Sequence, residues 1–324
     1  MKTIAVKIHE QGPPDVMKLE EINIDAPNTG EIQMEHTAIG LNYMDVYQRS
    51  GHYPMALPSG LGLEAAGVIT AVGDGVNDLQ IGDRIAYGPV LGAYAKHRNL
   101  AADKVVKIPD GIDDAAAAAV LMKGMTVEYL MCRAYPLKSG EDVLFHAASG
   151  GVGNIAGQWG RNIGARMIGV TSGKDNCTKI LANGYSDAID RNSEDVAKRV
   201  REMTNGKGVS VVFDSVGKAS FDASINSLAP RGYFMSFGAT TGEAPAVEPS
   251  LLQHKGSLYF CRPTLANYVA ERDDFVSSAS KVFEMVKSGA INVDIGQTCP
   301  LSQIVEIHKE FEVGNTTGST VLIP

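Results

Sequence analysis

The sequence has few cysteines, and their spacing does not indicate a disulfide framework or a metal-binding motif. Four cysteines occur among 324 residues, and no two of them form a CxxC pair. They are Cys132, Cys177, Cys261 and Cys299. Isolated cysteines of this kind are typical of reduced thiols in a cytosolic protein. We therefore expect a cytoplasmic protein without structural disulfides.

Long apolar segments and an excess of basic charge are also missing. No uninterrupted apolar run reaches the ~18 residues of a membrane-spanning helix. Met1–Glu10 alternates polar and apolar residues, unlike the apolar core of a secretory signal. Asp and Glu number 37 against 29 Lys and Arg, which gives a net charge of −8. This acidic balance disfavours binding to a membrane surface or to nucleic acid.

The first ~120 residues have the alternating pattern of β-strands, which is typical of half-buried sheets. Alanine-rich residues 113–122 and the helix-period stretch 126–135 then predict helices. The expected strands are Thr3–Ile8, Glu31–Ile39, Gly67–Val72 and Arg84–Tyr87.

From Asp142 onward, short apolar strands alternate with helices of about ten residues, which predicts right-handed βαβ units on a parallel sheet. The expected strands are Asp142–Ala147, Arg166–Thr171, Ala188–Asp190, Ser210–Asp214, Gly232–Phe237 and Ser257–Cys261. The expected helices are Gly151–Ile163, Lys174–Ala182, Asp195–Met203 and Ala219–Leu228. A helix over Phe275–Ser288 and a strand over Thr320–Ile323 close the chain.

A glycine-rich loop joins the first of these strands to its helix. Residues 145–153 read FHAASGGVG, a variant of the dinucleotide fingerprint with alanine in place of the first glycine. Gly150, Gly151 and Val152 would bring backbone N–H groups to a pyrophosphate at the helix N-terminus. The preceding strand, the following helix and a second strand about twenty residues on give this loop the required context.

The end of the second strand distinguishes NAD from NADP. NAD-dependent enzymes place an acid there, whereas this chain continues with Ser172, Gly173 and Lys174. Arg191 follows the third strand. Two cations and a hydroxyl suit a 2′-phosphate, although Asp175 is a weak counter-signal. We therefore expect NADPH as the cofactor.

Several longer stretches resemble the zinc-free quinone oxidoreductases of the medium-chain dehydrogenase/reductase superfamily, the group related to zeta-crystallin. The resemblance extends from near the N-terminus to Pro324. Its most specific stretches are AIGLNYMDVYQRSGHYP (38–54), LPSGLGLEAAGVI (57–69), LGAYAKH (91–97), LMKGMTVEYL (121–130), HAASGGVG (146–153), VVFDSVGK (211–218), GSLYFCRPTL (256–265) and TTGSTVLIP (316–324).

The resemblance implies an α/β protein with a doubly wound Rossmann sheet and a partly open, GroES-like β-barrel domain. Residues 1–122 and 265–324 would form the catalytic domain, and residues 123–264 the NADPH-binding domain, with the coenzyme in the interdomain cleft. The implied cofactor-binding residues are Asn42, Asp45, Tyr47, Lys123, Thr126, Tyr129, Gly150, Gly151, Val152, Ser172, Gly173, Lys174, Arg191, Phe237, Gly238, Ala239, Cys261, Arg262, Pro263 and Ser319. Many relatives have a lysine in place of Asn176 and a tyrosine in place of Arg191, so the phosphate contacts would differ in this chain.

The resemblance also implies that no metal takes part. Zinc-dependent relatives need a cysteine and a histidine where this chain has Asn42 and Leu63, and neither of these side chains can bind zinc. Glu64, beside Leu63, suits a structural hydrogen-bonding role or a catalytic one. No GxSxG motif indicates a hydrolase.

Three functions remain open from the sequence. The first is NADPH-dependent reduction of a small quinone, with Asn42 and Tyr53 positioning the nicotinamide and the reacting carbonyl rather than acting as general bases. The second is reduction of an activated C=C bond, in an enone or a haloacrylate. The third is a crystallin-like structural role or nucleic-acid binding. A homodimer is expected through Ser257–Cys261, an apolar strand at the sheet edge.

Overall fold

The computed structural model describes residues 1–314 and 316–324, and these residues form two compact units. The first unit comprises Met1–Lys123, Val269–Ser288 and Val293–Pro324. The second comprises Gly124–Tyr268 and Gly289–Asn292. Residues 289–292 were expected in the catalytic domain. They belong to the second unit, where the Gln158 side chain donates to the Asn292 carbonyl at 3.2 Å and accepts from the Asn292 N–H at 2.8 Å.

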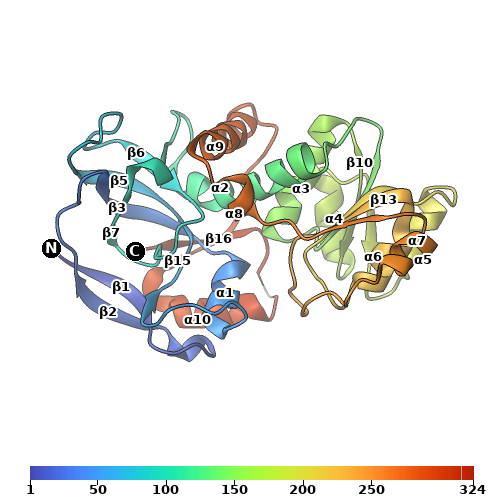
Figure 1. Ribbon diagram of the computed structural model, residues 1–324, viewed down its shortest axis with the longest axis horizontal. Helices are drawn as coiled ribbons and strands as arrows, with labels where there is room; N and C mark the ends of the chain where they lie inside the picture. Colours follow the sequence, from blue (N-terminus) through green and yellow to red (C-terminus); the bar gives the residue numbers. More distant parts are fainter. Residues whose placement is uncertain (315) are drawn as a thin grey trace. The chain divides into compact units, whose positions relative to one another are not determined.

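The first unit is built from both ends of the chain, as the blue and red segments of Figure 1 show. Its larger sheet has the order β15-β16-β3-β5-β6-β8, with β7 paired to β3, and its smaller sheet has the order β2-β1-β4. The C-terminal strand β16 pairs antiparallel with β3, where Val321 lies opposite Gly40. The strands are β1 (Lys2–Ile8), β2 (Lys18–Asn23), β3 (Glu31–Gly40), β4 (Ser59–Gly60), β5 (Glu64–Val72), β6 (Arg84–Tyr87), β7 (His97–Ala101), β8 (Val106–Lys107), β15 (Ile295–Pro300) and β16 (Ser319–Ile323).

Helices of the first unit include α1 (Tyr43–Ser50), α9 (Arg272–Lys287) and α10 (Ile304–Glu312). Short 3-10 turns lie at Pro14–Val16, Ala102–Lys104 and Leu301–Gln303. The core of this unit packs alternate residues of the strands, such as Val6 and Ile8 of β1, against Ile304 and Ile307 of α10. This alternation is the pattern that predicted β1 and β3 from the sequence.

The second unit is a parallel sheet with the strand order β11-β10-β9-β12-β13-β14. This order reverses between β9 and β12, the switch point at which doubly wound sheets bind nucleotides. The strands are β9 (Asp142–His146), β10 (Arg166–Thr171), β11 (Asp187–Asp190), β12 (Val209–Asp214), β13 (Leu228–Ser236) and β14 (Tyr259–Cys261). The helices are α3 (Gly151–Ile163), α4 (Lys174–Ala182), α5 (Val196–Met203), α6 (Phe221–Ser227), α7 (Pro249–His254) and α8 (Leu265–Tyr268).

Close packing of α3 on this unit depends on glycine. A Cβ added at Gly157 would overlap the Tyr185 ring, and one at Gly160 would overlap the Met167 side chain. The two glycines therefore let the helix backbone approach its neighbours, which is one of the roles of glycine in dinucleotide-binding folds.

One long helical segment differs from the sequence-based expectation. The two predicted helices of residues 113–135 form a continuous element, α2 (Asp114–Glu128), which ends in a π-helical segment, Tyr129–Ala134. Residues 114–134 are long and apolar enough to cross a membrane, but 72% of the window is buried inside the protein. Burial to this extent is typical of a core helix.

Candidate functional site

In the first unit, the structure brings together Asn42, Glu64 and Lys123. Asn42 lies between β3 and α1, Glu64 begins β5, and Lys123 lies on α2. The Asn42 Nδ2 atom donates to Glu64 Oε2 at 2.9 Å, and the Lys123 Nζ atom lies 3.5 Å from the same oxygen. The other carboxylate oxygen, Oε1, accepts the Met122 backbone N–H at 2.5 Å. Glu64 is fully buried, so this carboxylate joins three segments of the chain.

The contacts of Asn42 give its amide a direction. Its Nδ2 atom donates to Glu64 and, at 3.4 Å, to the Gly40 carbonyl, so the hydrogen-bonding capacity of its NH2 group is engaged. A carboxylate accepts hydrogen bonds, which assigns the NH2 group to the Glu64 side. The Oδ1 atom of Asn42 can only accept, and it does so from the Asp45 backbone N–H in the capping box that begins α1.

Asp45 does not extend outward as a ligand-lining side chain. It is fully buried, and its Oδ2 atom accepts the Asn42 backbone N–H at 2.9 Å and the Tyr94 hydroxyl at 2.8 Å. Burial raises the pKa of Asp45 to about 7. Asp45 and Glu64 thus hold Asn42 by its main chain and its side chain respectively.

Aromatic rings gather beside this cluster. Tyr47 on α1 lies at 5.7 Å from Tyr53 and at 4.8 Å from His52, measured between ring centroids. The Tyr53 N–H donates to the Tyr47 carbonyl at 3.2 Å, and Gln11 donates to the Tyr53 carbonyl at 2.9 Å. These bonds fix the backbone of Tyr53 and leave its half-buried ring at the surface of the unit. Ser319 is buried and donates to the Ala119 carbonyl of α2 at 3.2 Å.

In the second unit, the glycine-rich loop has the geometry of a phosphate-binding turn. Gly150 caps α3, so the N–H groups of Gly151 and Val152 lie in the first turn, where no intrahelical acceptor exists. Ala147, which replaces the first glycine of the fingerprint, adopts a left-handed φ of 54°. A Cβ at Gly153 would lie 2.5 Å from the Ala147 carbonyl oxygen. The loop is therefore a tight cradle that only glycine permits at position 153.

The edge beyond this loop carries the predicted cations. Ser172 and Gly173 follow β10, Lys174 begins α4, and Arg191 follows β11; both cations are exposed. Ser149 in the loop bonds Thr171 at the end of β10, with 2.7 Å between the hydroxyl oxygens. Asn176 donates to the Ser172 carbonyl at 2.9 Å instead of extending outward. The sequence did not indicate Asp190, which accepts the Gly173 N–H at 2.8 Å.

The remaining predicted residues of the second unit occupy different surroundings. The Gly238 backbone is so close to Ser215 that a Cβ would lie 2.6 Å from its carbonyl oxygen, and Ala239 is buried. Cys261 and Arg262 are exposed, whereas Pro263 is buried. Tyr129 is buried at the start of the π-helical segment and stacks on Tyr268 with ring centroids 4.6 Å apart. Thr126 lies on α2, half-buried.

A buried hydrogen-bond network behind the phosphate loop was not predicted. The Asp214 carboxylate at the end of β12 accepts from the Ser220 hydroxyl at 2.7 Å and from the Ser224 hydroxyl at 2.5 Å. Ser224 also lies 3.0 Å from His146 Nε2, at the end of β9. Burial lowers the pKa of His146, so the ring is neutral. Because the Ser224 hydroxyl donates to Asp214, its oxygen accepts from His146, which assigns the ring proton to Nε2. The network links the strand before the phosphate loop to β12.

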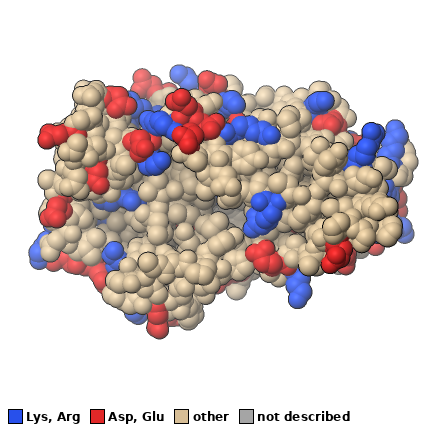
Figure 2. All heavy atoms as spheres, viewed as in Figure 1, with Lys and Arg blue, Asp and Glu red and all other residues tan. Residues whose placement is uncertain are grey.

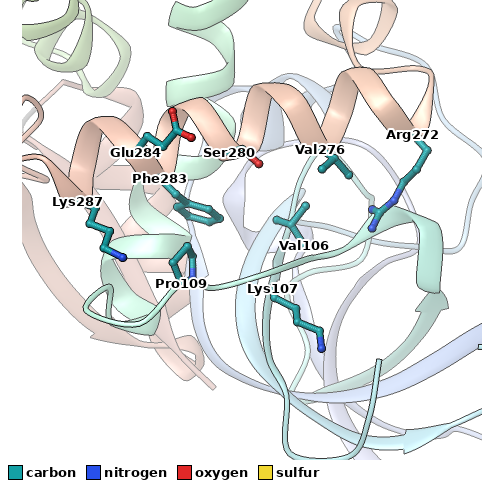
Figure 3. A pocket seen from close by; sticks show the side chains of 9 residues that line it. All are labelled: Val106, Lys107, Pro109, Arg272, Val276, Ser280, Phe283, Glu284 and Lys287. Carbon is teal, nitrogen blue, oxygen red and sulfur yellow. The ribbon is translucent and has the colours of Figure 1, made fainter. Parts of the chain in front are cut away.

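A pocket of about 360 Å³ lies in the first unit between α9 and the chain around β8 (Figure 3). Phe283 and Val276 of α9 face Val106 and Pro109 in this view. None of the predicted site residues lines it. In residues 1–314 and 316–324, no three His, Cys, Asp or Glu side chains are grouped to hold a metal ion.

Comparisons with known proteins agree with this arrangement. The alcohol dehydrogenase GroES-like domain family matches residues 28–110, and the zinc-binding dehydrogenase family matches residues 151–275. Quinone oxidoreductase from Pseudomonas aeruginosa is 43% identical, covering 97% of each chain. The 2-haloacrylate reductase of a Burkholderia species is 36% identical, covering 99% of each. The crystal structure of Escherichia coli quinone oxidoreductase complexed with NADPH matches with a TM-score of 0.97 and 41% identity, covering 99% of this chain and 100% of that one.

A GroES-like domain joined to a doubly wound nucleotide-binding domain defines a medium-chain dehydrogenase/reductase. Within that superfamily, the identity over nearly the full length of both chains shows that the protein belongs to the quinone oxidoreductase family.

Proposed function

We propose that the protein is a zinc-independent NADPH:quinone oxidoreductase located in the cytoplasm. The observation that supports this most is the phosphate cradle of Gly150–Gly153, followed by an edge with Lys174 and Arg191 and no acid directly after β10. The tight approach at Gly153 lets the start of α3 pack against the Ala147–Ala148 backbone, which is the role of the third glycine in a dinucleotide fingerprint. Relatives named quinone oxidoreductases over nearly the full chain support the substrate class.

On this proposal, each unit contributes a different part of the binding. In the second unit, Gly151 and Val152 donate N–H groups to the pyrophosphate, while Ser172, Lys174 and Arg191 bind the 2′-phosphate. In the first unit, Asn42 Oδ1 accepts from a ribose hydroxyl or the carboxamide NH2, which orients the nicotinamide. Tyr47 and Tyr53 offer flat apolar surface to an aromatic substrate.

Bound NADPH supplies a hydride from C4 of its nicotinamide. Asn42 orients that carbon, and Tyr47 and Tyr53 hold the quinone. The Tyr53 hydroxyl donates a hydrogen bond to the quinone oxygen on which negative charge develops. The hydride brings two electrons and one proton, so the anion that forms needs one more proton, which it takes from water, and no side chain has to act as an obligatory acid.

Reduction of an activated C=C bond is the second candidate function. The relative named 2-haloacrylate reductase, 36% identical over 99% of this chain, favours it. This reaction needs the same hydride and also a proton donor at the α-carbon. Tyr53 is the residue that we propose for that role if the second candidate is correct.

We also propose a homodimer formed through β14 at the edge of the parallel sheet. Tyr259 on this strand is 53% exposed and stacks on Tyr233 of β13, with ring centroids 4.4 Å apart. A rigid, exposed aromatic on an edge strand suits pairing with a second copy. On the face shown in Figure 2, acidic and basic side chains both occur, which gives no support to a nucleic-acid partner.

A turnover assay with NADPH and a panel of small quinones, enones and haloacrylates, repeated after chelation, tests the proposed function. We expect quinone reduction that survives chelation. Activity on enones alone would favour the second candidate. Loss of activity together with stoichiometric zinc would refute zinc independence, and no turnover on any substrate would favour a structural role.

Coenzyme affinity is tested separately. We expect the wild type to bind NADPH at least ~10-fold more tightly than NADH, and Arg191→Ala to lose most of that difference, because a charge-assisted contact contributes roughly 1.5–3 kcal/mol. Arg199→Ala is the control, since Arg199 pairs with Glu202 on α5. Equal affinity of the wild type for both coenzymes would contradict the preference.

A further inference from the structure

The ends of β10 and β11 are joined by two hydrogen bonds. The Arg191 N–H donates to the Thr171 carbonyl at 3.0 Å. The Gly173 N–H donates to the Asp190 Oδ1 atom at 2.8 Å. The first bond connects main chain to main chain, whereas the second depends on one side chain, that of Asp190. Gly173 adopts a left-handed φ of 81° as it caps α4, and the Asp190 side chain binds the N–H group of this turn.

The carboxylate of Asp190 is occupied by local donors. Besides Gly173, the Asn192 N–H donates to Oδ1 at 3.1 Å, and the Ser193 hydroxyl donates to Oδ2 at 3.0 Å. The hydrogen bond from the Gly173 N–H contributes most to lowering the pKa of Asp190, and the bonds from Asn192 and Ser193 lower it further. The carboxylate is therefore ionised, and its charge is directed at groups of the protein rather than presented alone to an incoming anion.

Each end of the Gly173–Asp190 bond lies one residue from a predicted phosphate-binding cation. Lys174 follows Gly173, and Arg191 follows Asp190. We propose that Asp190 is a positioning residue for coenzyme specificity, because its bond to Gly173 sets the spacing of Lys174 and Arg191 around the 2′-phosphate of NADPH. The inference rests on the proposed NADPH preference and identifies a residue that maintains it.

An opposite role for Asp190 makes a different prediction. A carboxylate beside the adenosine ribose could accept the 2′-hydroxyl of NADH directly and repel a 2′-phosphate. In that case, removing the carboxylate would strengthen NADPH binding and weaken NADH binding. The three donors already on Asp190 favour the positioning role.

Dissociation constants of NADPH and NADH, measured with the full-length protein by fluorescence titration, test the proposal. Asp190→Ala should weaken NADPH binding by ~10-fold, the effect of about one charge-assisted hydrogen bond, and NADH binding by less than ~2-fold. Asp190→Asn should fall between this variant and wild type, because its amide oxygen still accepts from Gly173. The matched control is Asp187→Ala at the other end of β11, which removes a 2.8 Å ion pair with Arg166 and should leave the ratio of the two constants unchanged.

If Asp190→Ala weakens NADPH and NADH binding equally, Asp190 has only a structural role and the proposal is overturned. A gain in NADPH affinity would also overturn it. If the alanine variant does not fold, Asp190→Asn still supports the proposal through a lower NADH-to-NADPH ratio of dissociation constants, and refutes it if the ratio does not fall. A wild-type protein without NADPH preference would overturn the proposed coenzyme itself, and this is seen before any variant is measured.

Discussion

At the scale of the residue, the buried carboxylate of Glu64 determines what Asn42 offers to a ligand. Because both bonds of the Asn42 NH2 group go to Glu64 and Gly40, the side chain has only its oxygen, an acceptor that also caps α1, to offer to a ligand. An acceptor cannot stabilise the oxyanion that forms on a quinone, which requires a donor. Asn42 is therefore better suited to orienting the coenzyme than to contacting the reacting carbonyl.

A double-mutant cycle tests this coupling. Asn42→Ala and Glu64→Gln should each weaken NADPH binding by ~2–10-fold, the effect of one hydrogen bond. The double variant should bind NADPH almost as tightly as Asn42→Ala does, since Glu64 acts through Asn42. Titration of all four proteins gives the coupling free energy, for which we expect at least ~0.5 kcal/mol. Additive losses would show that Glu64 affects binding independently of Asn42.

Tyr53 separates the two candidate reactions. Tyr53→Phe keeps the ring and loses the hydroxyl, so quinone turnover should fall by ~10-fold at most, with NADPH affinity unchanged. Steady-state kinetics and coenzyme titration measure the two effects, and Tyr43→Phe, at the start of α1, serves as a control. Abolished turnover with intact NADPH affinity would identify Tyr53 as an obligatory proton donor and favour C=C reduction.

At the scale of the element, helices and strands with a clear hydrophobic period were predictable from the sequence, and those with mixed residue types were not. The predicted bounds of α3, β10 and α4 agree with the structure, because strand and helix periods alternate sharply there. Helix α1 was missed: polar, charged and aromatic residues share its eight positions, and it is fixed by Asp45 and by packing. Strand β14 begins at Tyr259 rather than Ser257, because Ser257 adopts a left-handed φ of 58°.

The candidate site was partly predictable for the same reason. The phosphate loop is a local motif, so the sequence alone indicated Gly150–Val152. Contacts between distant segments, such as those of Glu64 with Asn42 and Met122, depend on tertiary folding and leave no local pattern. The family resemblance implied Asp45 as a cofactor-binding residue, yet its side chain lies buried, where it accepts from the Tyr94 hydroxyl.

The edge strand β14 makes a prediction about assembly. Light scattering at micromolar concentration should give about twice the chain mass of 34.4 kDa. Tyr259→Lys should shift the protein toward the monomer, because a lysine on an edge strand opposes pairing. Leu19→Lys is a matched control, since Leu19 is an exposed apolar residue on β2 at 44% exposure. A monomeric wild type, or dissociation by both variants, would contradict the proposed interface.

At the scale of the whole molecule, buried titratable groups of the first unit make stability depend on pH in opposing directions. Burial lowers the pKa of His36 and of His308 to about 3, so both rings are neutral in the folded protein. Their pKa in an unfolded chain is ~6.5, so below that pH the unfolded state binds more protons and the free energy of unfolding decreases. The pKa of Asp45 is raised to about 7, so as the pH falls from 7 toward 4 the folded state binds this proton before the unfolded state does. This proton uptake increases the free energy of unfolding.

Burial lowers the pKa of His36, His308 and His146, and raises that of Asp45, so we expect a net loss of stability as the pH is lowered from 6.5 to 4.5. Urea unfolding at several pH values measures it for the wild type, His36→Gln and Asp45→Asn. His36 bonds the Ala95 carbonyl and the Tyr87 hydroxyl at 2.7 and 2.9 Å, so His36→Gln should be less stable at pH 7.5 but lose less on acidification. Asp45→Asn should lose more, because the compensating proton uptake is gone. If all three proteins have the same pH slope, these buried groups do not control the acid stability, and the carboxylates of the surface ion pairs would have to account for it.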